Sequence, residues 1–329
     1  MSSDATRWGV WLHAVRPASE LAELAAAAEA LGAAAILVAD EGTDRDLFVT
    51  LAALAQRTRR ALLFGAVTNP HSRHPLVSAA AFASLAELAP GRVVAGFGAG
   101  GSRVFGPMGL SPRRPFTALA ECVEVVQALW RRETVTYQGE FSLRQAGLPW
   151  SPGSLPIAIA GRGPRVERLG AERADWLLLA GRPIRQVADL VRRLRGMGVA
   201  ARGRSAAIAW NANAAWTDAM RREMRAHLAY MLMDMPAQER AAVAAAPDTL
   251  LERYAVVGER PEVVARLAEL VRQVRPELLL FDADDYSPAF LERAASVAMD
   301  AGVVAVQNGE LGAGSWEHVE AAHGVDSHS

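Results

Sequence analysis

The sequence predicts a (β/α)8 barrel, a fold of the α/β class. Short apolar runs alternate with segments of helical periodicity from residue 8 to residue 301. Each run is apolar throughout, as strands are when helices cover both faces of a parallel sheet. No linker and no shift in composition divides the chain, which favours one closed barrel over two doubly wound domains.

The expected elements follow one another along the chain. The runs that we expect to form barrel strands are 8–12, 35–39, 62–67, 92–97, 156–160, 176–180, 206–214 and 277–281. The helices expected with them are 17–31, 45–58, 75–88, 116–130, 164–174, 184–195, 261–274 and 288–301. Outside this alternation, 135–143 is typical of a hairpin, and helices broken at Pro236 and Pro247 fill 218–253. We expect a barrel domain over 7–305 and a disordered tail over 306–329.

Composition narrows the class of protein. A net charge of −1 gives no electrostatic footprint for nucleic acid or an anionic membrane. No apolar run approaches the ~20 residues of a membrane span, and the first residues lack the pattern of a signal peptide. The single Cys122 excludes an internal disulfide and a cysteine-based zinc site. We therefore expect a cytoplasmic protein that acts on a small molecule, without nucleic-acid or membrane partners.

Polar residues follow the first two expected strands, where barrel enzymes place their active sites. Asp40 and Glu41 come directly after 35–39. A carboxylate there can polarise a substrate, or exchange protons if burial shifts its pKa. The alternative for Asp40 is a cap on the following loop. His13, which ends the first strand, faces either the substrate or the rim of the core.

The third expected strand ends in Thr68, Asn69 and Pro70. The Asn69 amide offers both a donor and an acceptor, which suits the edge of a flavin or deazaflavin ring. Its alternative is an Asx turn before Pro70. His71 and His74 are three residues apart without a supporting carboxylate pattern, so we expect no metal site.

A glycine-rich segment follows the fourth expected strand. Residues 96–101 have the spacing of a dinucleotide fingerprint, but Phe105-Gly106-Pro107 prevents the long helix that this motif must open. We expect Gly98, Ala99 and Gly100 to form a floor against which a flat cofactor packs. A plain tight turn is the alternative.

A second such segment, Gly161-Arg162-Gly163-Pro164, joins a strand to a helix. Glycines let the backbone approach a ligand, and Pro164 suits the first turn of a helix. The helix N-terminus, with Arg162 and Arg165, favours an anion. We expect a cofactor phosphate here, with an ordinary glycine-rich turn as the alternative.

Several motifs together resemble the bacterial-luciferase-like superfamily, over residues 8–301. They are Ala39-Asp40-Glu41 with Arg45-Asp46, Val67-Thr68-Asn69-Pro70 with Arg73-His74-Pro75, Gly91-Arg92 leading to residues 96–100, and residues 160–164 with 169–175. They are most similar to the branch that uses the deazaflavin coenzyme F420 and includes methylenetetrahydromethanopterin reductase. The resemblance implies an insertion after the fourth strand, a cofactor across the carboxyl ends of the strands, and a homodimer. It also implies a non-proline cis peptide behind the cofactor ring, for which Ala66–Val67 is the best-placed bond.

The resemblance implies an F420-dependent oxidoreductase that transfers a hydride between C5 of the deazaflavin and an unidentified small organic substrate. The candidate catalytic residues are His13, Asp40 and Glu41. Many F420 relatives carry Asp-His where this chain has Asp40-Glu41, which weakens transfer of an alcohol-dehydrogenase mechanism. Two alternatives remain: an FMN-dependent monooxygenase on the same barrel, and a non-catalytic cofactor-binding barrel protein. Residues 102–115 and 218–253 are expected to shape the substrate pocket.

Overall fold

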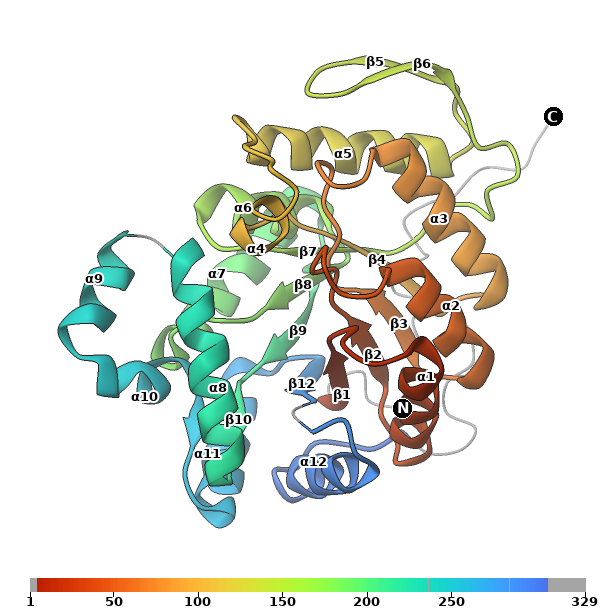
Figure 1. Cartoon of the computed structure of the whole chain (residues 1–329). Coiled ribbons are helices and arrows are strands. Elements are labelled where there is room, and N and C mark those ends of the chain that lie inside the picture. Colours follow the sequence, from red (N-terminus) through yellow and green to blue (C-terminus); the bar gives the residue numbers. More distant parts are fainter. Residues whose placement is uncertain (1–4, 236, 284, 307–329) are drawn as a thin grey trace.

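Eight parallel strands close into a barrel in the computed structural model of the chain, which describes residues 5–235, 237–283 and 285–306 (Figure 1). The strands are β1 (Arg7–Leu12), β2 (Ala35–Val38), β3 (Leu62–Gly65), β4 (Val93–Phe97), β7 (Ile157–Ala160), β8 (Trp176–Leu179), β9 (Ala207–Asn211) and β12 (Leu278–Asp282). They neighbour one another in this order, and β12 closes the barrel against β1. The predicted (β/α)8 barrel is confirmed, with its eight strands at the expected places in the chain.

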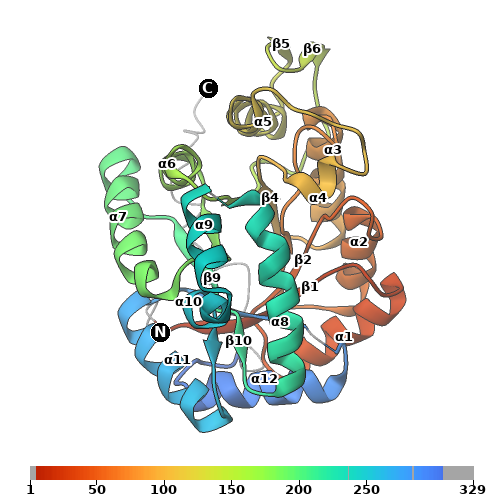
Figure 2. The ribbon, with the colours of Figure 1, turned by 60° about the vertical axis from the view of Figure 1, so that its left-hand side comes forward.

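Helices cover the outside of the barrel (Figures 1 and 2). They are α1 (Ala18–Ala30), α2 (Leu47–Arg57), α3 (Pro75–Leu88), α5 (Pro115–Trp130), α6 (Pro164–Arg173), α7 (Ile184–Arg202), α11 (Arg260–Val274) and α12 (Pro288–Asp300). Local sequence starts several of them. Asp46 accepts hydrogen bonds from Phe48 N and Val49 N at the start of α2. A proline opens α3, α5, α6 and α12, where its fixed φ suits the first turn.

Helix α7 is longer than predicted. The expected end at residue 195 is wrong, because the helix passes through Gly196 and Gly198 and ends at Arg202. Gly203 follows with φ +74°, the left-handed conformation that commonly terminates a helix. Gly198 is needed inside the helix, since a Cβ there would lie 3.0 Å from both Ala171 O and Arg204 O. The glycine marks close packing rather than a helix end.

The chain between β4 and β7 carries the insertion that the resemblance implies. It contains the short helix α4 (Ser102–Phe105), then α5, and then the antiparallel hairpin of β5 (Val135–Gln138) and β6 (Ser142–Ala146). The hairpin was expected over 135–143, and β6 extends it to residue 146. In Figure 1 the hairpin projects beyond α5.

A second insertion lies between β9 and α11. It comprises β10 (Ala214–Ala215), α8 (Asp218–Met231), η1 (Leu232–Asp234), α9 (Ala237–Ala245), η2 (Pro247–Thr249), α10 (Leu250–Tyr254) and β11 (Val256–Val257). The expected helices and the break at Pro247 are confirmed, and Pro236, the other expected break, lies outside the described residues. Strands β10 and β11 pair in parallel and tie the two ends of the insertion together. Figures 1 and 2 show α8, α9 and α10 grouped near α7 and α11.

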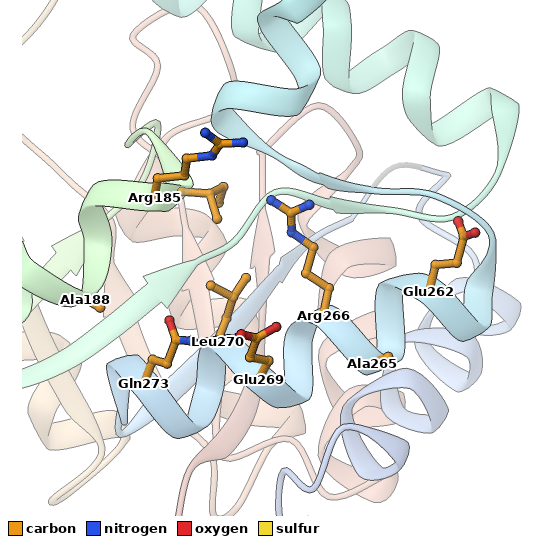
Figure 3. Close-up of a pocket in the computed structure, with 9 residues that line it drawn as sticks. Arg185, Ala188, Glu262, Ala265, Arg266, Glu269, Leu270 and Gln273 are labelled. Atoms are coloured by element: carbon orange, nitrogen blue, oxygen red, sulfur yellow. Dashed lines mark hydrogen bonds between the residues drawn. The ribbon is translucent and has the colours of Figure 1, made fainter.

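Helices α7 and α11 leave a groove of about 550 Å³ on the outer surface. Arg185 from α7 lines it on one side, and Arg266 and Leu270 from α11 line it on the other (Figure 3). None of the sequence-predicted site residues lines this groove, which is therefore separate from the candidate site at the strand ends.

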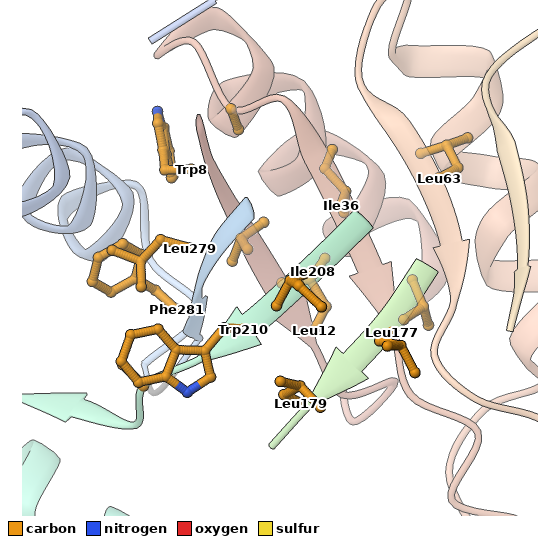
Figure 4. Close-up of a cluster of buried hydrophobic side chains, with 14 of the residues drawn as sticks. Trp8, Leu12, Ile36, Leu63, Leu177, Leu179, Ile208, Trp210, Leu279 and Phe281 are labelled. Carbon is orange, nitrogen blue, oxygen red and sulfur yellow. The ribbon is translucent and has the colours of Figure 1, made fainter. Parts of the chain in front are cut away.

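Buried side chains fill both faces of the barrel wall. On β2, Ile36 and Val38 belong to the outer layer against the helices, whereas Leu37 belongs to the cluster inside the barrel. Figure 4 shows part of the outer layer. Inside, the Phe64 and Trp176 rings meet edge to face at 5.3 Å. Because the interior is packed, as in other barrels of this class, the site must lie at the carboxyl ends of the strands.

The end of the described chain returns to the barrel. Val306 N donates to Gly32 O at 3.0 Å, and Val306 is buried. The rest of the expected tail, 307–329, lies outside the described residues. Within the described residues, no helix is both long and apolar enough to cross a membrane.

Candidate active site

A backbone floor lies at the carboxyl ends of β3 and β4. The Ala66–Val67 peptide bond is cis, as the resemblance implies. Ala66 N donates to Val38 O at 2.7 Å, and Thr68 N donates to Gly96 O at 3.0 Å. Gly98 N in turn donates to Thr68 O at 2.8 Å. These bonds fix residues 66–68 between β2 and β4.

Glycine is required where this segment approaches β4. A Cβ on Gly96 would lie 1.8 Å from Gly65 O, and a Cβ on Gly98 would lie 2.8 Å from Val67 Cγ2. The following loop turns at Gly100, with φ +82°, into the four-residue helix α4. The predicted absence of a long helix after residues 96–101 is confirmed. What results is a surface of backbone and Val67 that suits a flat ring.

Asn69 forms the Asx turn that was its alternative role. Its Oδ1 accepts hydrogen bonds from His71 N at 3.0 Å and Ser72 N at 2.9 Å, and its Nδ2 donates to Ser72 Oγ at 2.8 Å. The side chain is buried, so the turn is rigid. His74 also acts on the backbone: its Nδ1 accepts from Leu76 N at 3.2 Å and caps α3.

Asp40 lies next to the floor. Burial raises the pKa of its carboxyl, while the nearby Thr68 hydroxyl and the Arg73 guanidinium oppose the shift. Thr68 Oγ1 is itself buried, and no hydrogen bond of normal geometry joins it to a described group. Arg73 is held by an ion pair with Asp46 at 2.5 Å. Asp40 therefore has an environment in which protonation is easier than in water.

His13 and Glu41 come together across β1 and β2. His13 Nδ1 lies 3.9 Å from Glu41 Oε1, and Glu41 Oε2 lies 3.5 Å from Arg103 Nε on α4. The His13 backbone N–H donates to Tyr286 Oη at 3.0 Å. An imidazole, a carboxylate and a guanidinium thus meet at the rim of the barrel, and all three are partly exposed to solvent.

His227 reaches this group from the second insertion. Its ring centroid lies 5.8 Å from that of His13, with the planes at 68°. Burial lowers the pKa of His227, with Asp282 and Glu41 opposing the shift and His13 and Arg103 adding to it. Asp282, at the end of β12, accepts a hydrogen bond from Asn211 Nδ2 at 2.8 Å. A neutral imidazole beside carboxylates can accept a proton and release it again from the imidazolium form.

The sequence analysis did not select His227, Arg103 or Asp282. Asp282 had a usable signal, because it ends the last barrel strand as His13 ends the first. Arg103 lies in the loop that was expected to shape the pocket, with nothing to distinguish it from other surface arginines. His227 lies inside α8 and has no local signal, since only the tertiary fold brings it to His13.

The β7–α6 loop has features of an anion site at Arg162 and Gly163, but not at Arg165. Gly163 has φ +107°, and no side chain caps the start of α6. Burial and the neighbouring Arg182 lower the pKa of the Arg162 guanidinium. Arg165 points elsewhere: its guanidinium lies over the Phe116 ring, 4.0 Å from the centroid. The structure therefore separates the two arginines that the sequence analysis grouped.

Comparison with known proteins places this geometry in a family. A family model described as luciferase-like monooxygenase matches residues 2–275. Over 143 residues, 43% of each chain, the sequence is 35% identical to 5,10-methylenetetrahydromethanopterin reductase of Archaeoglobus fulgidus. Over 176 residues it is 35% identical to F420-dependent glucose-6-phosphate dehydrogenase of Nakamurella multipartita, covering 49% of this chain and 51% of that protein. The matched region spans about half the length of these relatives.

The fold has a close counterpart among solved structures. The coenzyme F420 dependent tetrahydromethanopterin reductase from Methanopyrus kandleri superposes with a TM-score of 0.75 at 20% identity. The superposition covers 88% of this chain and 97% of that one, including the barrel. Taken with the match over residues 2–275, the chain belongs to the luciferase-like monooxygenase family.

Proposed function

We propose that the protein is an F420-dependent oxidoreductase acting on a small organic substrate. The observation that carries the proposal is the floor formed by residues 66–68 and Gly98, which hydrogen bonds fix between β2 and β4. Val67 is the partly exposed residue of this floor, and the close approach of Gly98 to Val67 leaves no room for a side chain at residue 98. The partial similarity to a relative named F420-dependent glucose-6-phosphate dehydrogenase supports the deazaflavin over other flat cofactors.

The residues present fit such a cofactor at both ends. Ala66, Val67 and Thr68, with Gly98, Ala99 and Gly100, would support the ring, while Gly161, Arg162, Gly163 and Pro164 would hold the phosphate. The Asx turn occupies the acceptor oxygen of Asn69, so its remaining contribution to a ring edge is one amide hydrogen. Arg165 would act on the phosphate only by turning away from Phe116. Bound F420 supplies the carbon that accepts or donates the hydride.

The polar group at the rim would handle the substrate and its proton. His13 and Glu41 lie 3.9 Å apart and present an imidazole and a carboxylate to the same space. Arg103 orients Glu41 from the opposite side. Burial keeps His227 neutral at neutral pH, so it can accept a proton. Asp40, which neighbours Thr68 of the floor, would polarise the ring or the substrate, or exchange a proton with it because burial raises the pKa of its carboxyl.

Titration of the purified protein with F420 and, separately, with FMN tests the proposal by fluorescence. We expect micromolar or tighter binding of F420 and weaker binding of FMN. Preference for FMN would reassign the protein as a monooxygenase that uses reduced flavin and oxygen, in line with the family's description. Binding of neither would reject both. Tight F420 binding without turnover across broad panels of substrates would favour the non-catalytic alternative.

The proposal extends to the oligomeric state, the cellular location and the partners of the protein. We propose a homodimer, as the resemblance implies, and light scattering at micromolar concentration tests it. We also propose a cytoplasmic location, and we propose no nucleic-acid partner because the net charge of −1 gives no basic surplus. Fractionation of cells and a salt-dependent binding assay with DNA and RNA would check these points.

A further inference from the structure

A second cleft lies beside the β7–α6 loop. It has a volume of about 220 Å³ and lies between this loop, the start of α7 and α9. Its polar lining includes Arg162, Glu167, Arg182, Gln186, Arg193 and Glu239. Sites that enclose a whole drug-sized ligand have volumes of about 300–1,000 Å³. This cleft therefore suits one arm of a larger ligand.

Two hydrogen bonds hold Arg182 in the lining of the cleft. Its Nη2 donates to Gly161 O at 2.5 Å, and its Nη1 donates to Glu167 Oε1 at 2.7 Å. Its Nε is buried and has no hydrogen-bond partner among the described residues. A buried guanidinium hydrogen without an acceptor is costly, so a ligand oxygen would stabilise it.

One face of α7 supplies the second wall. Gln186, Leu190 and Arg193 are separated by four and three residues, so their side chains leave the helix on the same side. No hydrogen bond or ion pair within the described residues engages Arg193. The neighbouring Arg192 points around the helix instead and pairs with Asp189 at 3.1 Å. Of these two adjacent arginines, Arg193 alone lines the cleft.

The acidic residues of the cleft are already engaged. Glu167 pairs with Arg182, and Glu239 Oε2 accepts a hydrogen bond from Tyr254 Oη at 2.6 Å. Three arginines thus face two glutamates in the lining. Arg182 and Arg162 also lie close enough for one to lower the pKa of the other. The cleft therefore carries a positive surplus directly beside the proposed phosphate position.

We propose that this cleft binds anionic groups that the cofactor carries beyond its phosphate, namely the carboxylates of the glutamate chain of F420. This inference rests on the proposed function. The loop residue Gly163 is common to the phosphate position and to the cleft, so a chain leaving the phosphate would enter the cleft directly. FMN ends at its phosphate and has no group to place there. The cleft thus distinguishes the two cofactors by their tails rather than by their rings.

The test measures the affinity of F420 species with one glutamate and with five or more, and of FMN, for three proteins. These are the wild type, Arg193→Glu and the matched control Arg192→Glu. Both arginines are exposed on α7, so neither change is expected to prevent folding, and circular dichroism checks this point. Fluorescence titration reports binding directly and needs no substrate.

We expect the wild type to bind the long-tailed F420 more tightly than the one-glutamate form, with the gap narrowing in high salt. Arg193→Glu should weaken long-tailed binding by about fivefold or more, since it removes one ion pair and adds a repulsion. Binding of FMN should not change, and Arg192→Glu should behave as wild type. Equal affinity for both tail lengths, or equal effects of the two variants, would overturn the inference while leaving the proposed function intact. Absence of F420 binding to the wild type would instead reject the proposed function, and this inference with it.

Discussion

Replacing Gly98 by alanine tests whether the floor formed by residues 66–68 and Gly98 serves the cofactor. The new Cβ would lie 2.8 Å from Val67 Cγ2 and 3.4 Å from Ala160 O. Carbon atoms in contact normally lie about 3.5–4.0 Å apart, so Val67 would have to retreat. Its branched side chain has few rotamers with which to do so.

The magnitude follows from this overlap. Forcing an extra methyl into a packed site typically destabilises a protein by about 1–3 kcal/mol. Gly196→Ala provides the control, because a Cβ at Gly196 meets no atom within 4 Å inside α7. Alanine there should stabilise the protein by about 0.5–1 kcal/mol, as it does in helix interiors. The two Gly→Ala changes should therefore move stability in opposite directions.

Urea unfolding measures the stability of both variants, and fluorescence titration measures their affinity for F420. Displacement of Val67 alters the floor itself, so Gly98→Ala should lower the affinity by about tenfold or more, equivalent to ~1.4 kcal/mol. Gly196→Ala should bind as wild type. If Gly98→Ala were destabilised yet bound F420 normally, the floor would be a packing feature only, and the main support for the proposed function would be lost.

Three further predictions concern single side chains. Glu41→Gln should retain cofactor affinity but lower kcat/KM by about 100-fold or more, because the carboxylate lies 3.9 Å from His13 and 3.5 Å from Arg103. Steady-state kinetics on a substrate identified by screening measures the loss of kcat/KM. An equal loss of cofactor affinity would contradict this prediction. Burial lowers the pKa of His227, so the unfolded chain takes up its proton first as pH falls below about 6.5. The wild type should then lose stability between that pH and the lower folded-state pKa, and His227→Gln should lose less over the same interval in urea unfolding at pH 7.5 and 5.5. Glu29 accepts hydrogen bonds from the backbone N–H groups of Arg59, Arg60 and Ala61, which hold its pKa below the usual value against the effect of burial. Glu29→Ala should destabilise the protein by about 2–4 kcal/mol at neutral pH, and the difference from wild type should shrink as pH falls through the folded-state pKa of Glu29; a constant difference would refute this account.

The barrel was predictable because its strands carry their signal locally. Strands buried on both faces must be apolar at every position, and β2 and β8 satisfy this with four buried residues each. The end of α7 was not predictable in the same way, since glycine has two uses. At Gly203 it ends the helix with φ +74°, and at Gly198 it lets the Ala171 carbonyl approach. Only the neighbouring elements distinguish the two.

Only part of the candidate site could be predicted from the sequence, for a similar reason. Residues that touch backbone, such as Gly98 and the cis Ala66–Val67 bond, follow strands directly and are found from motif and position. Residues that would touch the substrate are supplied by long-range contacts, as when α8 brings His227 to His13 at 5.8 Å. The sequence of α8 shows only a helix there, because its histidine has no spacing relation to any other site residue.

Strand register brings three polar side chains to one rim of the barrel. β1 pairs with β2 so that Leu12 lies opposite Val38, and with β12 so that Trp11 lies opposite Asp282. Because His13 and Glu41 follow the paired ends of β1 and β2 and Asp282 ends β12, these three residues emerge at the same rim. The resemblance to F420-dependent enzymes leads us to expect a histidine after the second strand; this chain has Glu41 there, and His13 at the end of β1 lies 3.9 Å from it. The ends of neighbouring strands lie at one rim, so an imidazole on one strand can pair with a carboxylate on the next. Under the proposed function, Glu41 therefore still has an imidazole beside it, and the pair could carry out acid–base chemistry.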